Sequence, residues 1–340
     1  MRPRRGVTVG KFLPLHKGHE LLLQAAATHC NELTVLVGVT PNDPYSFEQR
    51  KRWITAAIQA GNQNTATMAI VADPDPDPNV AKDAEGTVVD ERYWQRWLEQ
   101  NAETLRDIEL VFTSDPYGQE LARRIGASWF PVDPTRETVP VSARQIRKDR
   151  RAYFHFVSDG AKPDVALTVA VVGAESTGKS MLVRALAEHY STTYAPEWGR
   201  TISDARDALS VADFDAILSM QKLLIRRAQL DSDGLCFTDT EAITTALYAP
   251  IYLGEEHANA WHIAREQRFS LYLLLDPTVP WVDDGTRVLD QPKRQAFHQA
   301  LIEALDRFGA PYQVIAGSSY EERQRQATLA VDALLTTSSR

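Results

Sequence analysis

The first 160 residues alternate short apolar runs with amphipathic segments. Apolar runs of strand length precede stretches in which apolar residues recur at helical spacing, and this alternation is typical of βαβ units with a parallel sheet. The expected strands cover residues 6–9, 33–40, 68–72, 109–113 and 128–132, and the expected helices cover residues 18–29, 48–60, 89–104, 117–125 and 142–150. This half is therefore expected to be a doubly wound α/β domain.

A second α/β pattern follows. Residues 165–172 form a nearly continuous β-branched run, as expected for a central parallel strand that is covered on both faces. Helical patterns and shorter strand-like runs alternate after it, at residues 193–195, 211–230, 234–238, 255–266, 271–275 and 312–316. The turn-rich stretch 158–164 is expected to be a linker, which gives domains at 1–160 and 165–340. The Asp-Pro repeat at 73–78 is expected to be a surface loop, because proline removes a backbone donor and restricts the residue before it.

Length and composition agree with two ordinary domains. The chain has 340 residues, of which 44% are hydrophobic and 24% are charged, as is typical of globular proteins. Its longest apolar runs are far shorter than a membrane span, and its basic start lacks the features of a signal peptide, so we expect a cytoplasmic protein without membrane contact. A net charge of −8 without a basic block argues against DNA as a partner. Cys30 and Cys236 are expected to be buried thiols.

The first candidate site is the string Gly-Lys-Phe-Leu-Pro-Leu-His-Lys-Gly-His at residues 10–19. It lies between a strand and a helix, where open α/β sheets bind ligands and free helix amides meet phosphate. His16 and His19 are three residues apart, so both can reach one triphosphate and stabilise charge during attack at its α-phosphorus. The alternative is a tight turn with two capping histidines. The expected site residues are Gly10, Lys11, Phe12, His16, Gly18 and His19.

A second element of this site is expected at residues 141–147. Ser142 can cap a helix there, and Arg147 can reach the β and γ phosphates or be a solvated helix charge. Together with the histidine string, this segment resembles the paired signatures of the nucleotidylyltransferase superfamily, in which the second signature is Ile-Ser-x-Thr-x-x-Arg. Arg144 stands where that family has threonine. The resemblance also implies that the turn with Ser114 and Asp115 contacts adenosine.

The second candidate site is the string Gly-Ala-Glu-Ser-Thr-Gly-Lys-Ser at residues 173–180, between a strand and a helix. This is the context of a P-loop, whose amides cradle a β-phosphate while Lys179 neutralises the β and γ oxygens and Ser180 binds Mg²⁺. Asp239 follows a later strand and could hold Mg²⁺ through water, orient an acceptor hydroxyl or cap a helix. The expected nucleotide-binding residues are Gly173, Glu175, Ser176, Thr177, Gly178, Lys179 and Ser180.

Further residues are candidates for substrate contacts. Glu197 could bind ribose hydroxyls and Trp198 could pack on a ring, although an ordinary ion pair between Glu197 and Arg200 is the simpler alternative. Trp94 lies in an aromatic helix and could stack on a ring or belong to the core. Arg287 and Arg294 could close a lid over the triphosphate, or be plain surface charges.

The C-terminal half is similar to the ribosylnicotinamide kinase domain of NadR-type proteins, and with the histidine string the resemblance spans almost the whole chain. It rests on the P-loop and on Glu197-x-Gly-Arg200, Asp239-Thr240, Thr244-Thr245, Tyr252-x-Gly254 and the run 281–287. The resemblance implies two steps: ATP phosphorylates ribosylnicotinamide to nicotinamide mononucleotide, and a second ATP adenylylates the mononucleotide to NAD and pyrophosphate. Tyr252 would contact substrate. Many relatives carry an N-terminal helix-turn-helix, which we do not expect here because the first strand begins by residue 7.

Three alternatives stay open at this point. The protein could be a kinase whose first domain only senses NAD or ATP. It could carry out both reactions on another nucleoside or on a vitamin phosphate such as riboflavin phosphate. It could be a transcriptional regulator without catalysis. The sequence does not determine whether the chain forms a homo-oligomer.

Overall fold

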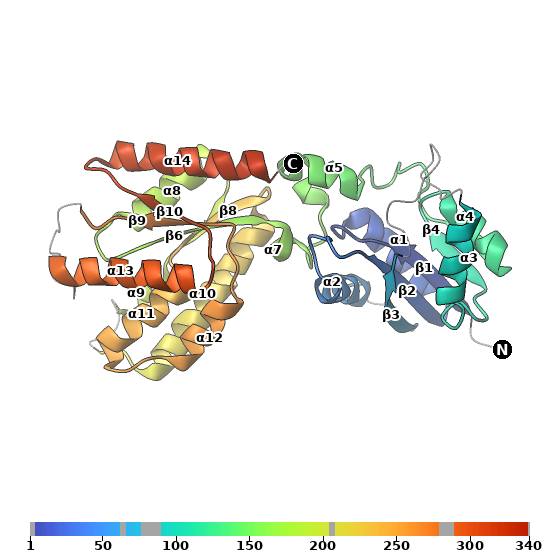
Figure 1. Cartoon of the computed structure of the whole chain (residues 1–340), viewed down its shortest axis with the longest axis horizontal. Helices are drawn as coiled ribbons and strands as arrows, with labels where there is room; N and C mark the ends of the chain where they lie inside the picture. Colours follow the sequence, from blue (N-terminus) through green and yellow to red (C-terminus); the bar gives the residue numbers. More distant parts are fainter. Residues whose placement is uncertain (1–3, 62–65, 76–89, 204–207, 279–288, 339–340) are drawn as a thin grey trace. The chain divides into compact units, whose positions relative to one another are not determined.

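The structure, a computed structural model, describes residues 4–61, 66–75, 90–203, 208–278 and 289–338. The chain divides into two compact units, Met1–Asp164 and Val165–Arg340 (Figure 1). Each unit contains one five-stranded sheet, and all the paired strands run parallel. No helix in the described ranges is long and apolar enough to cross a membrane.

The first unit has the strand order β3-β2-β1-β4-β5. Its elements are β1 (Arg5–Gly10), α1 (Lys17–His29), β2 (Glu32–Val39), α2 (Phe47–Gln59), β3 (Thr67–Pro74), α3 (Glu91–Gln100), β4 (Leu110–Thr113), α4 (Tyr117–Ile125), β5 (Ser128–Pro131), α5 (Ala143–Lys148), α6 (Arg150–Tyr153), the 3₁₀ turn η1 (Phe154–Phe156) and α7 (Lys162–Val165), which crosses the division. The chain leaves β1 toward β2 and later returns to β4 on the other side. This places a ligand-binding switch point at the carboxyl end of β1.

Helices cover both faces of this sheet. In Figure 1, α1 and α2 lie on one side of the strands, and α3 and α4 lie on the other. The α3 side packs through a cluster that includes Trp94, Trp97 and Leu121 against Val7 and Val111 of the sheet. Several of these helices begin at a capping residue. The side chains of Ser46, Asp90 and Ser142 accept hydrogen bonds from backbone amides in the first turns of α2, α3 and α5.

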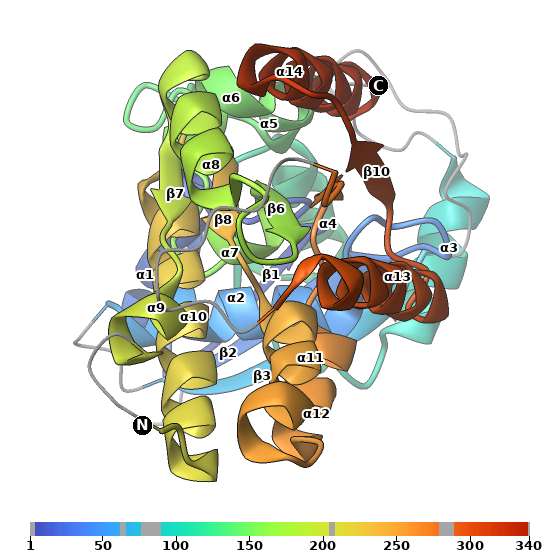
Figure 2. The same cartoon turned by 90° about the vertical axis from the view of Figure 1, so that its left-hand side faces the viewer.

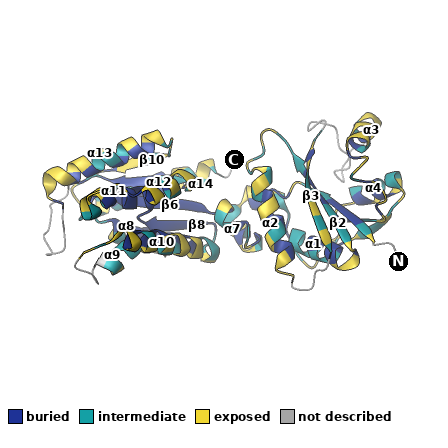
Figure 3. Ribbon diagram, turned by 90° about the horizontal axis from the view of Figure 1, so that it is seen from below, coloured by how far each residue is buried: buried dark blue, intermediate teal, exposed yellow. Residues whose placement is uncertain are grey.

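The second unit has the strand order β10-β9-β6-β8-β7. Its elements are β6 (Leu167–Gly173), α8 (Lys179–His189), β7 (Thr193–Ala195), α9 (Trp198–Ser203), α10 (Val211–Asp231), β8 (Leu235–Asp239), α11 (Ala242–Leu253), α12 (Ala258–Glu266), β9 (Leu271–Leu275), α13 (Gln291–Arg307), β10 (Tyr312–Ile315) and α14 (Tyr320–Thr337). Strand β6 lies at the centre and is buried over its whole length (Figure 3), as the apolar run predicted.

The two faces of this sheet carry separate cores. Alternate residues of β6 point to opposite faces: Val169 and Val171 pack with α8 and α14, whereas Ala170 and Val172 pack with α10 to α13. Figure 2 shows α8 and α14 together on one side of the strands, with α11, α12 and α13 on the other. The fold therefore leaves the carboxyl ends of β6 and β8 free for a site.

Two local expectations are wrong. The two units divide at the end of the predicted linker, after Asp164, but residues 158–164 are a packed part of the first unit. Ser158 and Ala161 are buried, and the Asp164 carboxylate accepts a hydrogen bond from Trp53 Nε1 at 2.6 Å. Asp73 and Pro74 are not in a loop but end strand β3. Proline is tolerated there because β3 is an edge strand. The remainder of the Asp-Pro repeat, residues 76–78, lies outside the described residues.

Two candidate nucleotide sites

The first unit contains a cavity of about 370 Å³ at the carboxyl edge of its sheet. The residues that line it include ten that the sequence singled out, namely Gly10, Lys11, Phe12, His16, Gly18, His19, Trp94, Ser114, Asp115 and Ser142. One wall is aromatic, since Tyr93 and Trp97 join Trp94 there. The cavity therefore combines phosphate-binding groups with a surface suited to a flat ring.

His16 and His19 stack against each other at the start of α1, with ring centroids 3.7 Å apart. Burial, and then the charge of Arg136, lower the pKa of His16 to about 4, and burial with the neighbouring His16 holds the pKa of His19 well below its usual value. Both imidazoles are therefore neutral at pH 7. The His16 backbone N–H points at His19 Nδ1 at 3.4 Å, which favours the tautomer in which His19 Nε2 carries the proton.

The loop before α1 is tightly packed. A Cβ on Gly18 would lie 3.1 Å from the His16 ring, so a side chain there would push against the catalytic candidate. Phe12 adopts a left-handed backbone conformation with φ of 51°, is buried, and sets its ring edge against His19 at a centroid distance of 4.9 Å. Phe12 therefore packs against the His19 ring and also lines the cavity.

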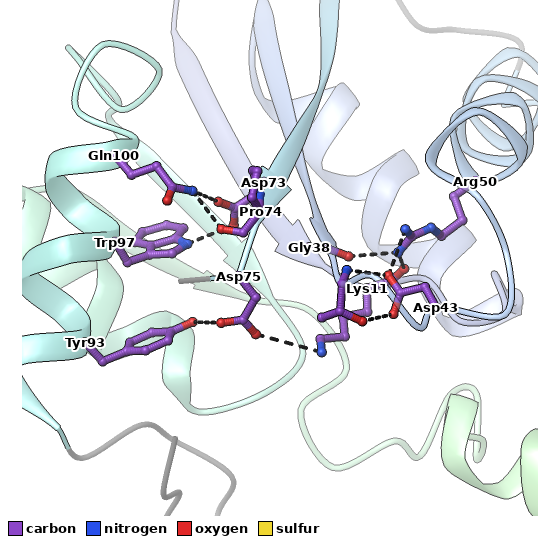
Figure 4. A network of polar contacts seen from close by, with 11 residues as sticks. Lys11, Gly38, Asp43, Arg50, Asp73, Pro74, Asp75, Tyr93, Trp97 and Gln100 are labelled. Carbon is purple, nitrogen blue, oxygen red and sulfur yellow. Dashed lines mark hydrogen bonds and ion pairs between the residues drawn. The ribbon is translucent and has the colours of Figure 1, made fainter. Parts of the chain in front are cut away.

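Two carboxylates at the end of β3, those of Asp73 and Asp75, organise the aromatic wall (Figure 4). Asp73 accepts hydrogen bonds from Trp97 Nε1 at 2.8 Å, Asn101 Nδ2 at 3.0 Å and Gln100 Nε2 at 3.1 Å. Burial raises the pKa of Asp73, although these donors act in the opposite direction. The sequence reading missed Asp73, because its Asp-Pro context suggested a loop.

Asp75 lies two residues after Asp73 and connects the aromatic wall to Lys11 of the histidine string. It accepts a hydrogen bond from Tyr93 Oη at 3.2 Å, and its carboxylate lies 3.9 Å from Lys11 Nζ (Figure 4). Residues two apart on an extended strand share a face, so Asp73 and Asp75 both point at α3. Lys11 is thus held at the cavity rim, where it can meet an anionic ligand.

We expect Asp73→Ala to destabilise the first unit by about 3 kcal/mol, because it leaves buried N–H donors of α3 without their acceptor, at about 1–3 kcal/mol for each such group. Urea unfolding followed by tryptophan fluorescence measures this. Asp159→Ala is the matched control, since Asp159 is exposed and its ion pair with Lys162 is a surface pair. Equal stability of the two variants would contradict the role of Asp73.

At the other end of the cavity, Asp115 is paired with Arg136. Arg136 Nη2 lies 2.8 Å from Asp115 Oδ1, and its Nη1 donates to the carbonyl oxygen of Val141 at 3.2 Å. Arg136 and Asp133 both line the cavity. The turn that contains Asp133 and Arg136 therefore supplies a cation whose charge acts on both histidines.

Ser142 caps α5 as expected, with its Oγ accepting from the Gln145 amide at 3.3 Å. Arg147 donates to the carbonyl oxygen of Leu13 in the histidine loop. It is exposed and is not among the residues that line the cavity, so in this structure it supports the loop. Arg144 is likewise exposed and is not among the residues that line the cavity.

Arg50 of α2 is a buried residue that the sequence analysis did not single out. It donates to the carbonyl oxygens of Lys11 at 2.9 Å and Gly38 at 2.8 Å, and pairs with Asp43 at 3.0 Å (Figure 4). Arg50 therefore fixes the backbone from which the Lys11 side chain extends. An arginine in the first turn of an amphipathic helix gives no sign in the sequence that it will be buried.

The P-loop of the second unit joins β6 to α8. Lys179 is buried and donates from Nζ to the Ala174 carbonyl at 3.1 Å, and Thr177 Oγ1 donates to the same oxygen at 2.8 Å. Gly173 has φ of 152° and a Cβ there would lie 3.0 Å from the Leu275 carbonyl, so glycine is required. Ser180 follows Lys179 in the first turn of α8.

Asp239 ends β8, which is paired directly with β6. Its carboxylate is buried, and Oδ1 has no hydrogen-bond partner among the described residues. The helix-cap alternative is wrong, because Glu241 caps α11 by accepting from the Ile243 and Thr244 amides. An orphaned carboxylate oxygen near a P-loop serine fits Mg²⁺, a hard cation that prefers such oxygens.

Glu197 lies among the charges of this site. Burial raises the pKa of Glu197, while the charge of Lys179 lowers it and the charge of Asp239 raises it. The ion pair with Arg200 is present at 3.8 Å, with the Glu197 side chain 21% exposed. Gln221 of α10, which the sequence analysis missed, accepts from the Trp198 amide at 2.9 Å and donates to the Asp239 carbonyl at 3.3 Å.

Three further candidate residues of the second unit remain, namely Tyr252, Arg294 and Arg287. Burial, followed by the charges of Glu175 and Glu197, raises the pKa of Tyr252 to about 12, so its hydroxyl stays protonated beside these carboxylates. Arg294 does not belong to a lid: it is fully buried in the first turn of α13, and its Nε donates to the Glu175 carbonyl at 3.0 Å. Arg287 lies outside the described residues.

Comparison with known proteins links both halves to one family. The chain is 29% identical over 341 residues to "Trifunctional NAD biosynthesis/regulator protein NadR" of Escherichia coli (strain K12), covering 94% of this chain and 80% of the relative. It is 30% identical over 348 residues to the protein of the same name from Salmonella typhimurium, covering 94% of this chain and 82% of the relative. A family described as "AAA domain" matches residues 168–323.

Solved structures agree at the level of the fold. A crystal structure of a NadR protein in complex with NR superposes with a TM-score of 0.70 and 24% identity, covering 99% of this chain and 97% of that chain. A second, in complex with NAD and AMP-PNP, gives a TM-score of 0.68 and 22% identity, covering 98% and 96%. Since the match to the Salmonella typhimurium relative reaches 30% identity over most of both chains, this chain belongs to the NadR family.

Proposed function

We propose that the chain makes NAD in two ATP-dependent steps, one in each unit. The observation that supports this proposal most is that one chain holds two groups of residues suited to phosphate but of different chemistry. One is a stacked pair of histidines in an aromatic cavity, and the other is a P-loop lysine in the same unit as a buried carboxylate oxygen without a partner among the described residues. The relatives named for NAD biosynthesis match across both units. A pyridine nucleotide accounts for both sites, because it has a hydroxyl to phosphorylate and a flat ring to stack.

In the second unit, the 5′-hydroxyl of ribosylnicotinamide attacks the γ-phosphorus of ATP. The bond to the β,γ-bridging oxygen breaks, ADP leaves, and the hydroxyl proton passes to a carboxylate. Lys179 stabilises the charge on the β and γ oxygens. Glu197 and Asp239 are the carboxylates within the site, and burial makes Glu197 the stronger base by raising its pKa. Mg²⁺ held with Ser180 and Asp239 would neutralise phosphate charge.

In the first unit, a phosphate oxygen of the mononucleotide attacks the α-phosphorus of a second ATP, and pyrophosphate leaves. The nucleophile is already ionised, so no general base is required. His16 and His19 would donate N–H groups to the oxygens on which charge develops, and Lys11 would exchange Asp75 for the triphosphate. Trp94 and Trp97 offer the ring a stacking surface.

The test is incubation of the purified full chain with magnesium-ATP and either ribosylnicotinamide or nicotinamide mononucleotide, followed by chromatography of mononucleotide, NAD and pyrophosphate. NAD from both substrates supports the two-step proposal. Mononucleotide without NAD would limit the chain to the kinase step, and absence of both products would overturn the choice of a pyridine substrate.

Arg144→Thr is expected to change NAD formation from the mononucleotide by less than about 3-fold, the effect of an ordinary surface substitution. The reason is that Arg144 is exposed and outside the cavity lining. Steady-state rates of pyrophosphate release measure the effect. A tenfold gain would mean that the arginine obstructs the site, and a tenfold loss would mean that it binds phosphate.

A further inference from the structure

Two buried arginines hold the backbone of the P-loop from behind. Arg294 of α13 donates to the Glu175 carbonyl at 3.0 Å, and Arg323 of α14 donates from Nη1 to the Thr177 carbonyl at 3.1 Å. Both arginines are less than 4% exposed. Complete burial of an arginine is uncommon and is costly unless its donors are satisfied, so these contacts call for a functional reason.

Arg323 joins three loops at the carboxyl edge of the sheet. Besides Thr177, it donates from Nη2 to the Asp276 carbonyl at 2.8 Å and from Nε to the Gly317 carbonyl at 2.9 Å. These residues lie in the loops that follow β6, β9 and β10, which are consecutive neighbours in the sheet. The planar fork of a guanidinium holds its donors in fixed directions and can therefore bridge three carbonyl oxygens at once.

The planarity of the peptide group links these contacts to the phosphate site, because a fixed carbonyl also fixes the direction of the next N–H. In a trans peptide the C=O and the following N–H point in opposite directions. When the carbonyls of Glu175 and Thr177 turn toward the arginines, the N–H groups of Ser176 and Gly178 turn away from them. Those two amides then face the side of the loop on which a phosphate is cradled.

The residue between the two held carbonyls is strained. Ser176 has φ of 61°, a left-handed conformation that is unfavourable for a residue with a side chain. Such conformations persist where the surroundings over-determine them. Arg294 holds the peptide group that precedes Ser176, and Arg323 holds the Thr177–Gly178 peptide group one residue beyond it. Together they restrict the loop around Ser176 and therefore contribute to that constraint.

We propose that Arg294 and Arg323 are positioning residues that keep the P-loop amides directed at the nucleotide phosphates, and that neither arginine touches the nucleotide. This rests on the proposed kinase function. The two guanidinium groups also leave fixed positive charge behind the loop, in a region of low dielectric where it favours bound phosphate.

The test compares Arg323→Lys, which keeps the charge but loses the fork, with Arg325→Lys two residues further on the exposed side of α14. We expect Arg323→Lys to raise the KM for ATP in ribosylnicotinamide phosphorylation by about 10- to 100-fold, the range for lost hydrogen bonds to a charged group, while the KM for ribosylnicotinamide changes by less than about 3-fold. Arg325→Lys should match the wild type. NAD formation from the mononucleotide should stay unchanged in both variants.

Folding is monitored by circular dichroism melting of the same samples. Arg294→Lys, which disturbs only the Glu175 side, replaces Arg323→Lys if the latter does not fold. An unchanged KM for ATP in a folded variant would overturn the proposal, as would parallel losses for both substrates together with a lower melting temperature. Calorimetric titration with ATP, in which the variant should weaken one of two sites, gives the same answer if the wild type phosphorylates no nucleoside.

Discussion

Replacing Lys179 with methionine is expected to lower ribosylnicotinamide phosphorylation by about 10³-fold, the scale of losing a fixed cation on the transferred phosphoryl group. Lys179 is buried, and its ammonium is held over the P-loop by the Ala174 carbonyl at 3.1 Å. Methionine keeps the apolar stem in its packing but removes the charge. The measurement is ADP release in the presence of magnesium-ATP and ribosylnicotinamide.

The chain supplies its own control for this substitution. NAD formation from the mononucleotide uses the other unit, and it should remain within about 2-fold of the wild type. Lys222→Met, at an exposed position of α10, removes an equal charge from the same unit and should change nothing. A loss of both activities in Lys179→Met would indicate misfolding, and retention of phosphorylation would mean that the P-loop is not the reaction site.

The parts of both sites that the sequence predicted are local in the chain. In each site a strand, a glycine-rich turn and the start of a helix are contiguous in the chain, so the conformations of residues 10–19 and 173–180 depend mainly on nearby residues. In the structure His16 contacts His19, and Lys179 donates a hydrogen bond within its own loop. The caps behave similarly, since the Ser142 cap needs only the next three residues. Parallel strands follow from the apolar runs for the same reason.

The parts that the sequence did not predict depend on contacts between distant segments. Arg50 and Arg323 look like ordinary helix charges, and only the packing of α2 and α14 buries them against carbonyl oxygens 39 and 146 residues away. The proline repeat predicts a loop at Asp73, because the edge position of β3, where proline is tolerated, is a property of the whole sheet. The sequence predicts a lid residue or a surface charge at Arg294, because the packing of α13 that buries it depends on segments distant in the chain.

His19→Ala is expected to slow adenylylation of the mononucleotide by about 10²- to 10³-fold, the usual cost of removing one hydrogen-bond donor to developing charge. His19→Gln should recover part of this loss, because a glutamine amide can place an N–H near the position of Nε2. Ribosylnicotinamide phosphorylation is the internal control, and His155→Ala, at an exposed position of the same unit, is the matched one. Pyrophosphate release measures the effect.

The pH dependence of kcat/KM for NAD formation distinguishes two forms of the catalytic histidines, a neutral imidazole that donates a hydrogen bond and a charged imidazolium. Burial lowers the pKa of His16 to about 4 and holds that of His19 well below 6.5, so the free enzyme keeps both rings neutral as the pH falls through 6.5. Since kcat/KM reports ionisations of the free enzyme and the free substrates, and phosphate monoesters titrate near pH 6, the profile for NAD formation should follow the substrate phosphates through this range. A further fall from the histidines should appear only toward pH 4. An activity that instead rises as the pH is lowered through 6.5 would show that a protonated histidine is the active form, which the stacked, buried pair opposes.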